Sequence, residues 1–327
     1  DVFHLSLSGT TKLRGMLEIV SSASEFETVP IRRHEDVLLR RIYDRMPLKL
    51  DKIRFENPFH KTFVLLQAHF SRLTLPADLA QDQRDILNRV LTLLNACVDV
   101  MSSGAMLNAI VAMEISHMCV QAVWDRDSPL RQVPHFTAAT IQRCQARGIH
   151  DVYALADVLP DMSQHERDEL LQLNKRQLAD VATLTNEFPY VDIEFDILDK
   201  EKLDSASTII LQAKLERDVD EEEEEPSDPT AIAPFYPSPK MTAWWLVIGD
   251  PGTNSLLSIK RVTIAKTLDV RLEFMLPAGM HDKLKLYLMC DSYIGADREL
   301  EVPALHVAQG EEDEELDDED NIEMPDA

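Results

Sequence analysis

The stretch QDQRDILNRVLTLLNACVDVMSSG, residues 81–104, decides the fold of the N-terminal part of this chain. Its apolar residues recur at the three- and four-residue spacing of a helix that buries one side. Its polar residues gather on a narrow stripe on the opposite side of the same helix. We therefore predict an amphipathic helix whose apolar face joins a core. The polar stripe consists of Arg84, Asn88, Thr92, Asn95 and Asp99.

The next stretch, AMLNAIVAMEISHMCVQAVW at residues 105–124, is apolar nearly all the way round. Its main polar line is Glu114, His117 and Gln121. A helix of this kind must be surrounded by other elements, which places it at the centre of a helical bundle. Helical spacing also occurs in three upstream segments, with prolines between them. These patterns predict a helical bundle over residues 1–131.

A helix-loop-helix domain is predicted at residues 132–189, after a proline-containing linker. Thr137 is placed to cap a first short helix, and Gly148 is placed to end it. Two further helix starts are marked by capping boxes, at Ser163–Glu166 and Asn174–Gln177. The segment is therefore expected to fold as a compact set of short helices.

After residue 189 the apolar period changes from that of a helix to that of a strand. About seven alternating segments follow, with turn residues between them and no helical pattern. They predict an immunoglobulin- or fibronectin-like antiparallel β-sandwich over residues 190–310. The turn GDPGTNS at residues 249–255 lies between two of these segments and favours a β-hairpin over a phosphate cradle. The expected fold class is multidomain, α then β.

The formal net charge of -25 is concentrated in two segments. Residues 218–228 carry eight acids and residues 311–327 carry eleven, with no Lys or Arg in either. Like charges in such runs repel, so we predict an exposed acidic loop and a disordered acidic tail. Their role is either an interaction tail or solvation of flexible ends. So acidic a chain is a poor candidate for binding free nucleic acid.

No catalytic motif stands out in the sequence. The phosphate loop G-x-x-x-x-G-K-[ST], the elbow G-x-S-x-G and the zinc motif H-E-x-x-H are all missing. We predict no catalytic residues, no metal and no cofactor in this chain. Asp291, Asp297 and Glu299 are expected to be turn residues, with a calcium site as the weaker alternative. The four cysteines are expected to be reduced core thiols: Cys97, Cys119, Cys144 and Cys290.

Membrane insertion is not indicated by the sequence. No apolar run reaches the roughly 18 residues needed to span a bilayer. No signal peptide is visible at the N-terminus. The chain begins at Asp1 without a methionine, so we expect it to be a fragment of a longer protein.

Two features suggest interaction surfaces. The polar stripe on residues 81–104 is either a solvated helix face or a face toward a nucleic-acid strand, whose bases its amides and Arg84 would contact. Trp244 and Trp245 are neighbours on a predicted strand, so they point to opposite faces and only one can enter the sandwich core. The other must be covered by a loop, a neighbouring domain or a partner.

The order of these parts and several motifs identify a family resemblance. The order of bundle, helix-loop-helix and sandwich resembles the Sec63 homology unit of Ski-type superfamily-two RNA helicases. The resemblance is closest to the C-terminal unit of the spliceosomal two-cassette helicases. The motifs that carry it are VPIRRHED, HKTFVLLQAHFSRL, LLNACVDVMSS, VPHFTAATIQRC, LLQLNKRQLADVA and WWLVIGDPGTNSLLSIKRVT.

The resemblance implies a non-catalytic interaction and regulatory module within a parent protein. That parent would bind ATP and Mg²⁺, unwind paired small nuclear RNAs during pre-mRNA splicing and be located in the nucleus. The implied partners are the preceding helicase domains and other spliceosomal proteins. In active relatives the helix matching residues 81–104 lies along the nucleic-acid channel, which would turn Asn88, Asn95 and Asp99 toward RNA.

Two departures from the family pattern imply weak or absent RNA binding by the isolated chain. The stripe carries little positive charge, and the helix-loop-helix has Gly148 but lacks the paired glycines of a nucleic-acid-binding hairpin. Two alternatives remain open. One is an RNA-binding accessory domain along residues 81–104, and the other is the cytosolic Sec63 domain of the endoplasmic-reticulum translocation complex.

Overall fold

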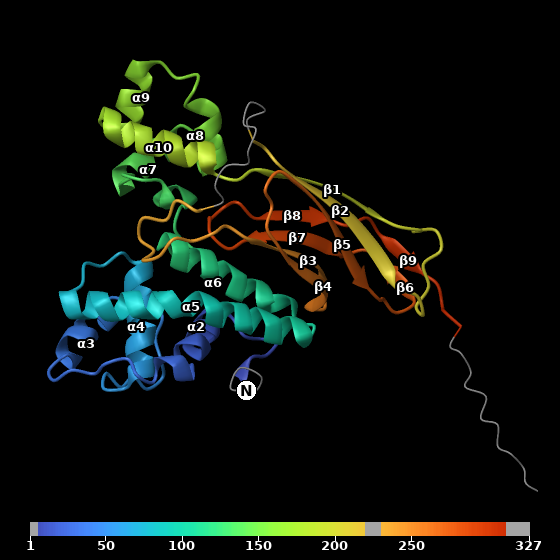
Figure 1. Ribbon diagram of the computed structural model, residues 1–327, viewed down its shortest axis with the longest axis horizontal. Coiled ribbons are helices and arrows are strands. Elements are labelled where there is room, and N and C mark those ends of the chain that lie inside the picture. The colour runs from blue at the N-terminus through green and yellow to red at the C-terminus, as the bar shows by residue number, and fades with distance from the viewer. Residues whose placement is uncertain (1–5, 220–229, 312–327) are drawn as a thin grey trace, which may run out of the picture.

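The computed structural model describes residues 6–219 and 230–311, in which helices come first and strands follow (Figure 1). All but residue 311 of the acidic tail, and all but residues 218 and 219 of the acidic loop, lie outside the described residues. The α-helices are α2 (Leu13–Ser21), α3 (Asp36–Asp44), α4 (Pro58–Phe70), α5 (Ala77–Ser103), α6 (Ile110–Gln121), α7 (Ala138–Ala146), α8 (Val152–Val158), α9 (Gln164–Leu171) and α10 (Lys175–Glu187). Short 3-10 helices lie at η1 (Ser24–Phe26), η2 (Leu107–Ala109) and η3 (Pro129–Gln132).

The long amphipathic helix predicted from residues 81–104 is confirmed as α5. It begins earlier, at Ala77, because Pro76 occupies the N-cap position and its fixed backbone suits a helix start. The apolar helix predicted at residues 105–124 is shorter than expected. Ala105 has a φ of 53° and breaks the helix, so that η2 and then α6 follow. Nearly all of α6 is buried, as its composition predicted.

The caps predicted in the helix-loop-helix segment are confirmed. The Thr137 side chain accepts from the backbone N–H of Thr140, and both capping boxes are present in full. Gly148 follows α7 with a φ of 76°, a left-handed conformation that favours glycine. Local side-chain to backbone bonds therefore fix where these short helices begin and end.

The strands form antiparallel sheets, as the alternating pattern predicted. One sheet has the order β1-β2-β5, a second has β4-β3-β7-β8, and β6 pairs with β9. The turn at residues 249–255 is confirmed as a hairpin, because β3 and β4 pair across it. The strands are β1 (Val191–Ile197), β2 (Ile209–Arg217), β3 (Trp244–Asp250), β4 (Ser255–Val262), β5 (Thr267–Phe274), β6 (Gly279–His281), β7 (Lys285–Cys290), β8 (Arg298–Glu301) and β9 (Leu305–Val307).

Two hydrophobic cores hold these elements together. The first contains the buried residues of the bundle together with Trp245, Val247 and Met289 from the four-stranded sheet. The second contains the helix-loop-helix residues and apolar residues of both larger sheets. Neither core coincides with one predicted unit. The boundaries 1–131, 132–189 and 190–310, and the sandwich arrangement itself, stay predictions.

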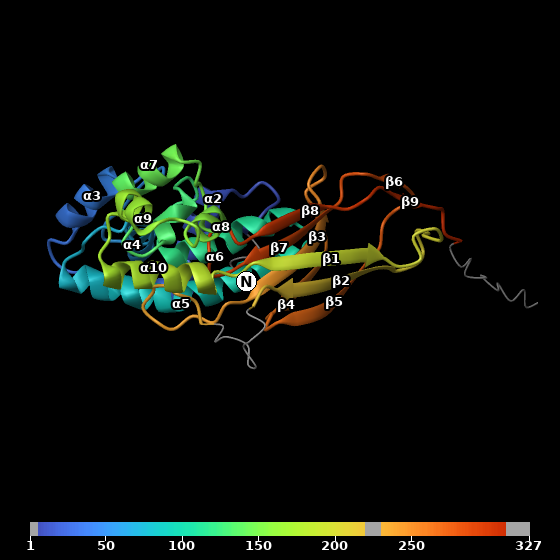
Figure 2. The same ribbon diagram turned by 90° about the horizontal axis from the view of Figure 1, so that it is seen from above.

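Helix α6 lies alongside the four-stranded sheet and is hydrogen-bonded to it near both ends (Figures 1 and 2). Near its N-terminus, the amide of Leu107 donates to the Asn254 carbonyl at 3.1 Å, and the amide of Leu256 donates to the Ala105 carbonyl at 2.9 Å. At its C-terminus, Gln121 Nε2 donates to the Ser292 carbonyl at 2.7 Å. These bonds fix the helices relative to the strands at two separated points.

Candidate functional site

The polar stripe of α5 lies on the surface of the bundle. All five of its side chains are exposed, as the sequence predicted. The Arg84 guanidinium donates to Gln81 Oε1 at 2.5 Å, one turn away on the same helix. Asn88 is engaged by a distant part of the chain, since Ser238 Oγ donates to Asn88 Oδ1 at 2.6 Å. The structure therefore places the five residues on one exposed face of α5. One of them, Asn88, is hydrogen-bonded to a segment far away in the sequence.

The contact on Asn88 comes from the segment 230–243, which joins the acidic loop to β3 and which we call the crossing segment. An antiparallel bridge between Thr230 and Met241 closes its base. Tyr236 Oη donates to the Leu87 carbonyl at 3.0 Å, and the Arg72 guanidinium lies 4.1 Å from the Phe235 ring centre. Most of this proline-rich segment is exposed, Phe235 to 47%. The Tyr236 hydroxyl and the Phe235 ring nevertheless contact the bundle.

The hydrogen bond from Tyr236 to the bundle is expected to stabilise the folded chain. We expect Tyr236→Phe to lower the free energy of unfolding by about 1 kcal/mol, because one hydrogen bond is lost while the ring remains. Burial raises the pKa of Tyr236 to about 12, so the hydroxyl stays protonated and able to donate at neutral pH. Urea denaturation followed by circular dichroism measures the change. Tyr190→Phe is the control, because its ring is exposed, and an equal loss in both variants would contradict the expectation.

The two adjacent tryptophans lie on opposite faces of β3. Trp244 belongs to the second core and Trp245 to the first, with exposed fractions of 2% and 4%. The Arg261 guanidinium lies 3.8 Å from the Trp245 ring centre, a cation–π contact. Trp245 therefore packs among the bundle residues, whereas Trp244 enters the core that the sheets share.

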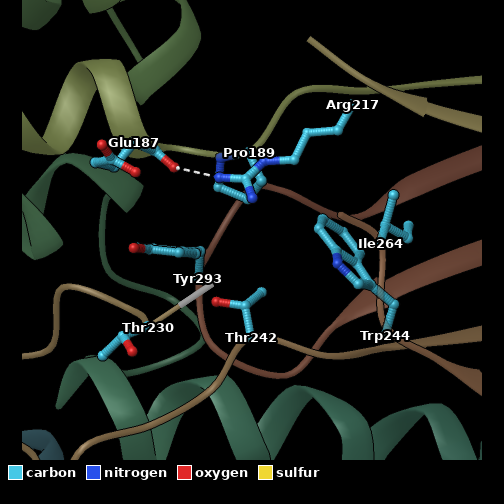
Figure 3. Close-up of a pocket in the computed structure, with 8 residues that line it drawn as sticks. All are labelled: Glu187, Pro189, Arg217, Thr230, Thr242, Trp244, Ile264 and Tyr293. Carbon is cyan, nitrogen blue, oxygen red and sulfur yellow. Dashed lines mark hydrogen bonds between the residues drawn. The ribbon is translucent and has the colours of Figure 1, made fainter. Parts of the chain in front are cut away.

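A small cavity lies beside Trp244, where α10 meets the sheets (Figure 3). The Arg217 guanidinium donates to the Glu187 carbonyl at 3.4 Å across its upper edge. The space open to the centre of a water molecule is about 10 Å³, which is enough for about one water. This cavity is too small for a substrate. Its lining residues are Glu187, Pro189, Arg217, Thr230, Thr242, Trp244, Ile264 and Tyr293.

A buried ionic network lies in the bundle around Lys61, which is 0% exposed. Lys61 Nζ donates to Glu35 Oε2 and to Asp82 Oδ2, both at 2.7 Å. Arg32 donates to both Asp82 oxygens, at 2.5 and 2.9 Å. Burial alone would raise the pKa of Asp82, but the bonds from Arg32 and Lys61 outweigh it and lower that pKa. Two cations and two carboxylates are thus matched, which indicates a structural role. Sequence reasoning missed this network.

The three acids considered for calcium each have a different partner. Asp291 accepts from Lys240 at 2.7 Å and from Arg261 at 2.5 Å. Asp297 accepts from the Cys290 amide at 2.6 Å, and Glu299 pairs with Lys285. Across residues 6–219 and 230–311, no three His, Cys, Asp or Glu side chains are grouped as a metal site would require. Asp291 and Asp297 lie beside the ends of β7 and β8, whereas Glu299 lies within β8, so it is not the turn residue that the sequence predicted.

The remaining sequence-based candidates are also accounted for by packing. All four cysteines are buried and free, as predicted, and burial raises the pKa of Cys97 to about 12. His117 is buried, and its Nδ1 lies 3.2 Å from the Cys290 carbonyl oxygen. In the hairpin turn, the Gly252 amide donates to Asp250 Oδ1 at 2.8 Å. That bond stabilises the turn that joins β3 and β4.

Within the part of the chain that the structure describes, no helix combines the length and the apolar character needed to cross a bilayer.

Comparison with known proteins finds one family and several relatives. The sequence model of the Sec63 Brl domain matches residues 1–303. The chain is 46% identical over 302 residues to Pre-mRNA-splicing factor brr2 of Schizosaccharomyces pombe, covering 92% of this chain and 14% of that protein. It is 42% identical over 318 residues to the U5 small nuclear ribonucleoprotein 200 kDa helicase of Homo sapiens, covering 97% and 14%.

A relative with a different name is the Activating signal cointegrator 1 complex subunit 3-like protein of Dictyostelium discoideum. It is 39% identical over 308 residues, covering 92% of this chain and 14% of that protein. The chain thus spans about one seventh of the length of these relatives. The family match covers most of the chain and agrees with the motifs seen in the sequence. The chain belongs to the Sec63 Brl domain family, among homologues that are Ski-type helicases.

Proposed function

We propose that this chain is a non-catalytic protein-interaction and regulatory module of a spliceosomal RNA helicase. The observation that carries the proposal is the pair Trp244 and Trp245, which lie next to each other on β3 but in different cores. Helices and strands are thereby joined into one body with large outer surfaces, which suits a docking platform. The printed names of the relatives support a helicase of pre-mRNA splicing and the U5 particle as the parent, and hence a nuclear location.

In this proposal the chain itself holds no cofactor. ATP and Mg²⁺ bind in other parts of the parent helicase, which unwinds paired small nuclear RNAs. The partners are the helicase domains of the same protein and other splicing proteins. We also propose that the two larger sheets form the two layers of an immunoglobulin- or fibronectin-like sandwich. The apolar residues that both sheets contribute to the second core support this arrangement.

The proposal is tested by affinity purification with the 327-residue chain as bait. The nuclear extract is first treated with ribonuclease, so that proteins held only through RNA are not retained. We expect splicing proteins to be retained, because their binding depends on folded protein surfaces. The control is the Lys61→Ala variant, which the buried network predicts to be strongly destabilised, so it should retain much less. If the folded chain retains no splicing protein, the proposal is wrong.

A second candidate function is single-stranded RNA binding along α5, which the exposed stripe favours. Two observations weigh against it. The stripe carries one cation and one anion, Arg84 and Asp99, and the crossing segment already contacts Asn88. RNA affinity depends on cations near phosphates and is strongest at low salt. Titration of labelled single-stranded RNA in about 20 mM salt decides the question. Binding that Arg84→Glu abolishes would support this function, and no binding would exclude it.

The third sequence-based alternative was the translocation protein of the endoplasmic reticulum. The relatives named above support the helicase instead, since two are named as splicing or U5 proteins. The sequence on the N-terminal side of Asp1 in the gene distinguishes the two. A helicase cassette there would support the proposal, and a transmembrane region would contradict it.

A further inference from the structure

The surface around α3 carries a cluster of arginines. Arg33, Arg40, Arg41 and Arg45 are exposed. None of the four forms an ion pair within the described parts of the chain. The acids of the helix itself, Asp36 and Asp44, are fewer, so cations are in excess here. This excess is notable in a chain whose formal net charge is -25.

A groove lies directly beside this charged surface, between α3 and the connection from α4 to α5. Arg41 and Arg45 line it from α3, one turn apart on the same face of the helix, and Asp44 lines it beside them. Its volume is about 700 Å³, within the range of pockets that hold ligands or anchoring side chains. The apolar residues that line it are Leu38, Ile42, Leu73, Leu75 and Pro76.

Two further apolar residues, one on α3 and one just before it, are exposed. Val37 is 52% exposed, and Ile31, just before the helix, is 40% exposed. Leu38, Leu73 and Leu75 pack on the first core but remain only partly buried. Apolar residues that adjoin one another on a surface and are rimmed by charge mark interaction sites more often than isolated ones do.

We infer that the groove beside α3 binds an acidic, amphipathic segment of a partner protein. Apolar side chains of that segment would pack on the apolar lining, and its carboxylates would pair with Arg41 and Arg45, which outnumber the one acid of the lining, Asp44. A protein fits better than RNA, because no aromatic ring lines the groove on which a base could stack. This inference rests on the proposed function as an interaction module and names the chemistry of one partner.

The test places a photo-cross-linker in the groove of the complete chain. Thr74 is exposed and lines the groove, so p-benzoylphenylalanine at this position reaches an occupant without disturbing the core. The labelled chain is irradiated in nuclear extract, and the attached peptide is identified by mass spectrometry. We expect one dominant segment that is rich in Asp and Glu and carries apolar residues at helical spacing.

Charge-reversed variants provide the decisive comparison. Arg41→Glu with Arg45→Glu should lower the cross-linking yield at least about tenfold, because two attractive contacts become repulsive. Lys260→Glu with Lys266→Glu makes the same charge change on exposed residues of the sheet region and should leave the yield unchanged. Raising the salt from about 50 to about 300 mM should lower the yield of the unmodified chain. Thermal unfolding of each variant checks that it is folded.

The outcomes separate this inference from the proposed function. Attachment to RNA, attachment to a basic segment, or equal yields from both double variants would overturn the inference. Retention of splicing proteins with no cross-link at Thr74 would also overturn it, while leaving the proposed function intact. If no splicing protein is retained at all, the proposed function itself fails.

Discussion

Lys61→Ala is expected to lower the free energy of unfolding by about 3–5 kcal/mol, the cost of leaving buried charges without a partner. Lys61 is 0% exposed, and Glu35 and Asp82 depend on it for hydrogen bonds at 2.7 Å. Arg32 remains near Asp82, but it lies at the surface and cannot replace the buried ammonium. Urea denaturation followed by circular dichroism measures the change.

Two controls show whether the cost comes from the unpaired charges. Lys52→Ala removes an exposed lysine and should change the free energy of unfolding by less than about 0.5 kcal/mol. The triple variant Lys61→Met, Glu35→Leu and Asp82→Leu removes the buried charges together and should recover most of the loss. A triple variant that is less stable than Lys61→Ala would show that the network itself, and not the unpaired charge, carries the effect.

Trp245→Ala is expected to cost about 3–5 kcal/mol and to loosen the helices as well as the strands. The ring is 4% exposed and belongs to the core that the bundle contributes. Its removal also leaves the Arg261 guanidinium without the ring that it stacks on. Hydrogen exchange followed by mass spectrometry should show faster exchange in α5 and α6, because a cavity now separates them from the sheet.

Trp244→Ala is the matched comparison, since the same side chain is lost from the neighbouring position on the same strand. Trp244 lies in the second core, so exchange should rise in β2, β5 and β7 while α5 and α6 stay protected. The same exchange pattern in both variants would contradict this expectation. It would show that the two cores do not respond separately to the loss of a tryptophan.

Local patterns predicted much of this fold. The spacing of Ile86, Val90, Leu93 and Leu94 established α5, because a helix buries residues three and four apart whatever it packs against. The capping boxes at Ser163–Glu166 and Asn174–Gln177 marked helix starts through bonds that span only three residues. The alternation along residues 268–276 likewise predicted β5.

Features that join distant parts of the chain could not be predicted in this way. Lys61 pairs with Asp82, 21 residues away, and Tyr236 bonds to Leu87, 149 residues away. Nothing in the proline-rich sequence itself indicates that it lies on the bundle. A partial signal for the ionic network did exist, because Lys61 interrupts the nearly continuous apolar surface of α4. A lysine on such a helix needs a buried carboxylate.

In the candidate site, too, local features were predictable from the sequence and long-range contacts were not. The exposure of the α5 stripe was predictable from periodicity, but its contact with Ser238 was not. The opposite directions of Trp244 and Trp245 followed from strand geometry. Which of them would meet the bundle depended on how the sheet lies on α6, which is a matter of tertiary packing. The cations around α3 were visible in the sequence, whereas the apolar groove beside them was not.

The attachment of α6 at both ends has a mechanical consequence. The Ala105–Leu107 link is bonded to the hairpin that joins β3 and β4, and Gln121 is bonded to the turn after β7. A rotation of the helices about either point would break the bonds at the other. The helices and strands therefore resist hinge motion, and partners bound to each would be held at a fixed distance and orientation.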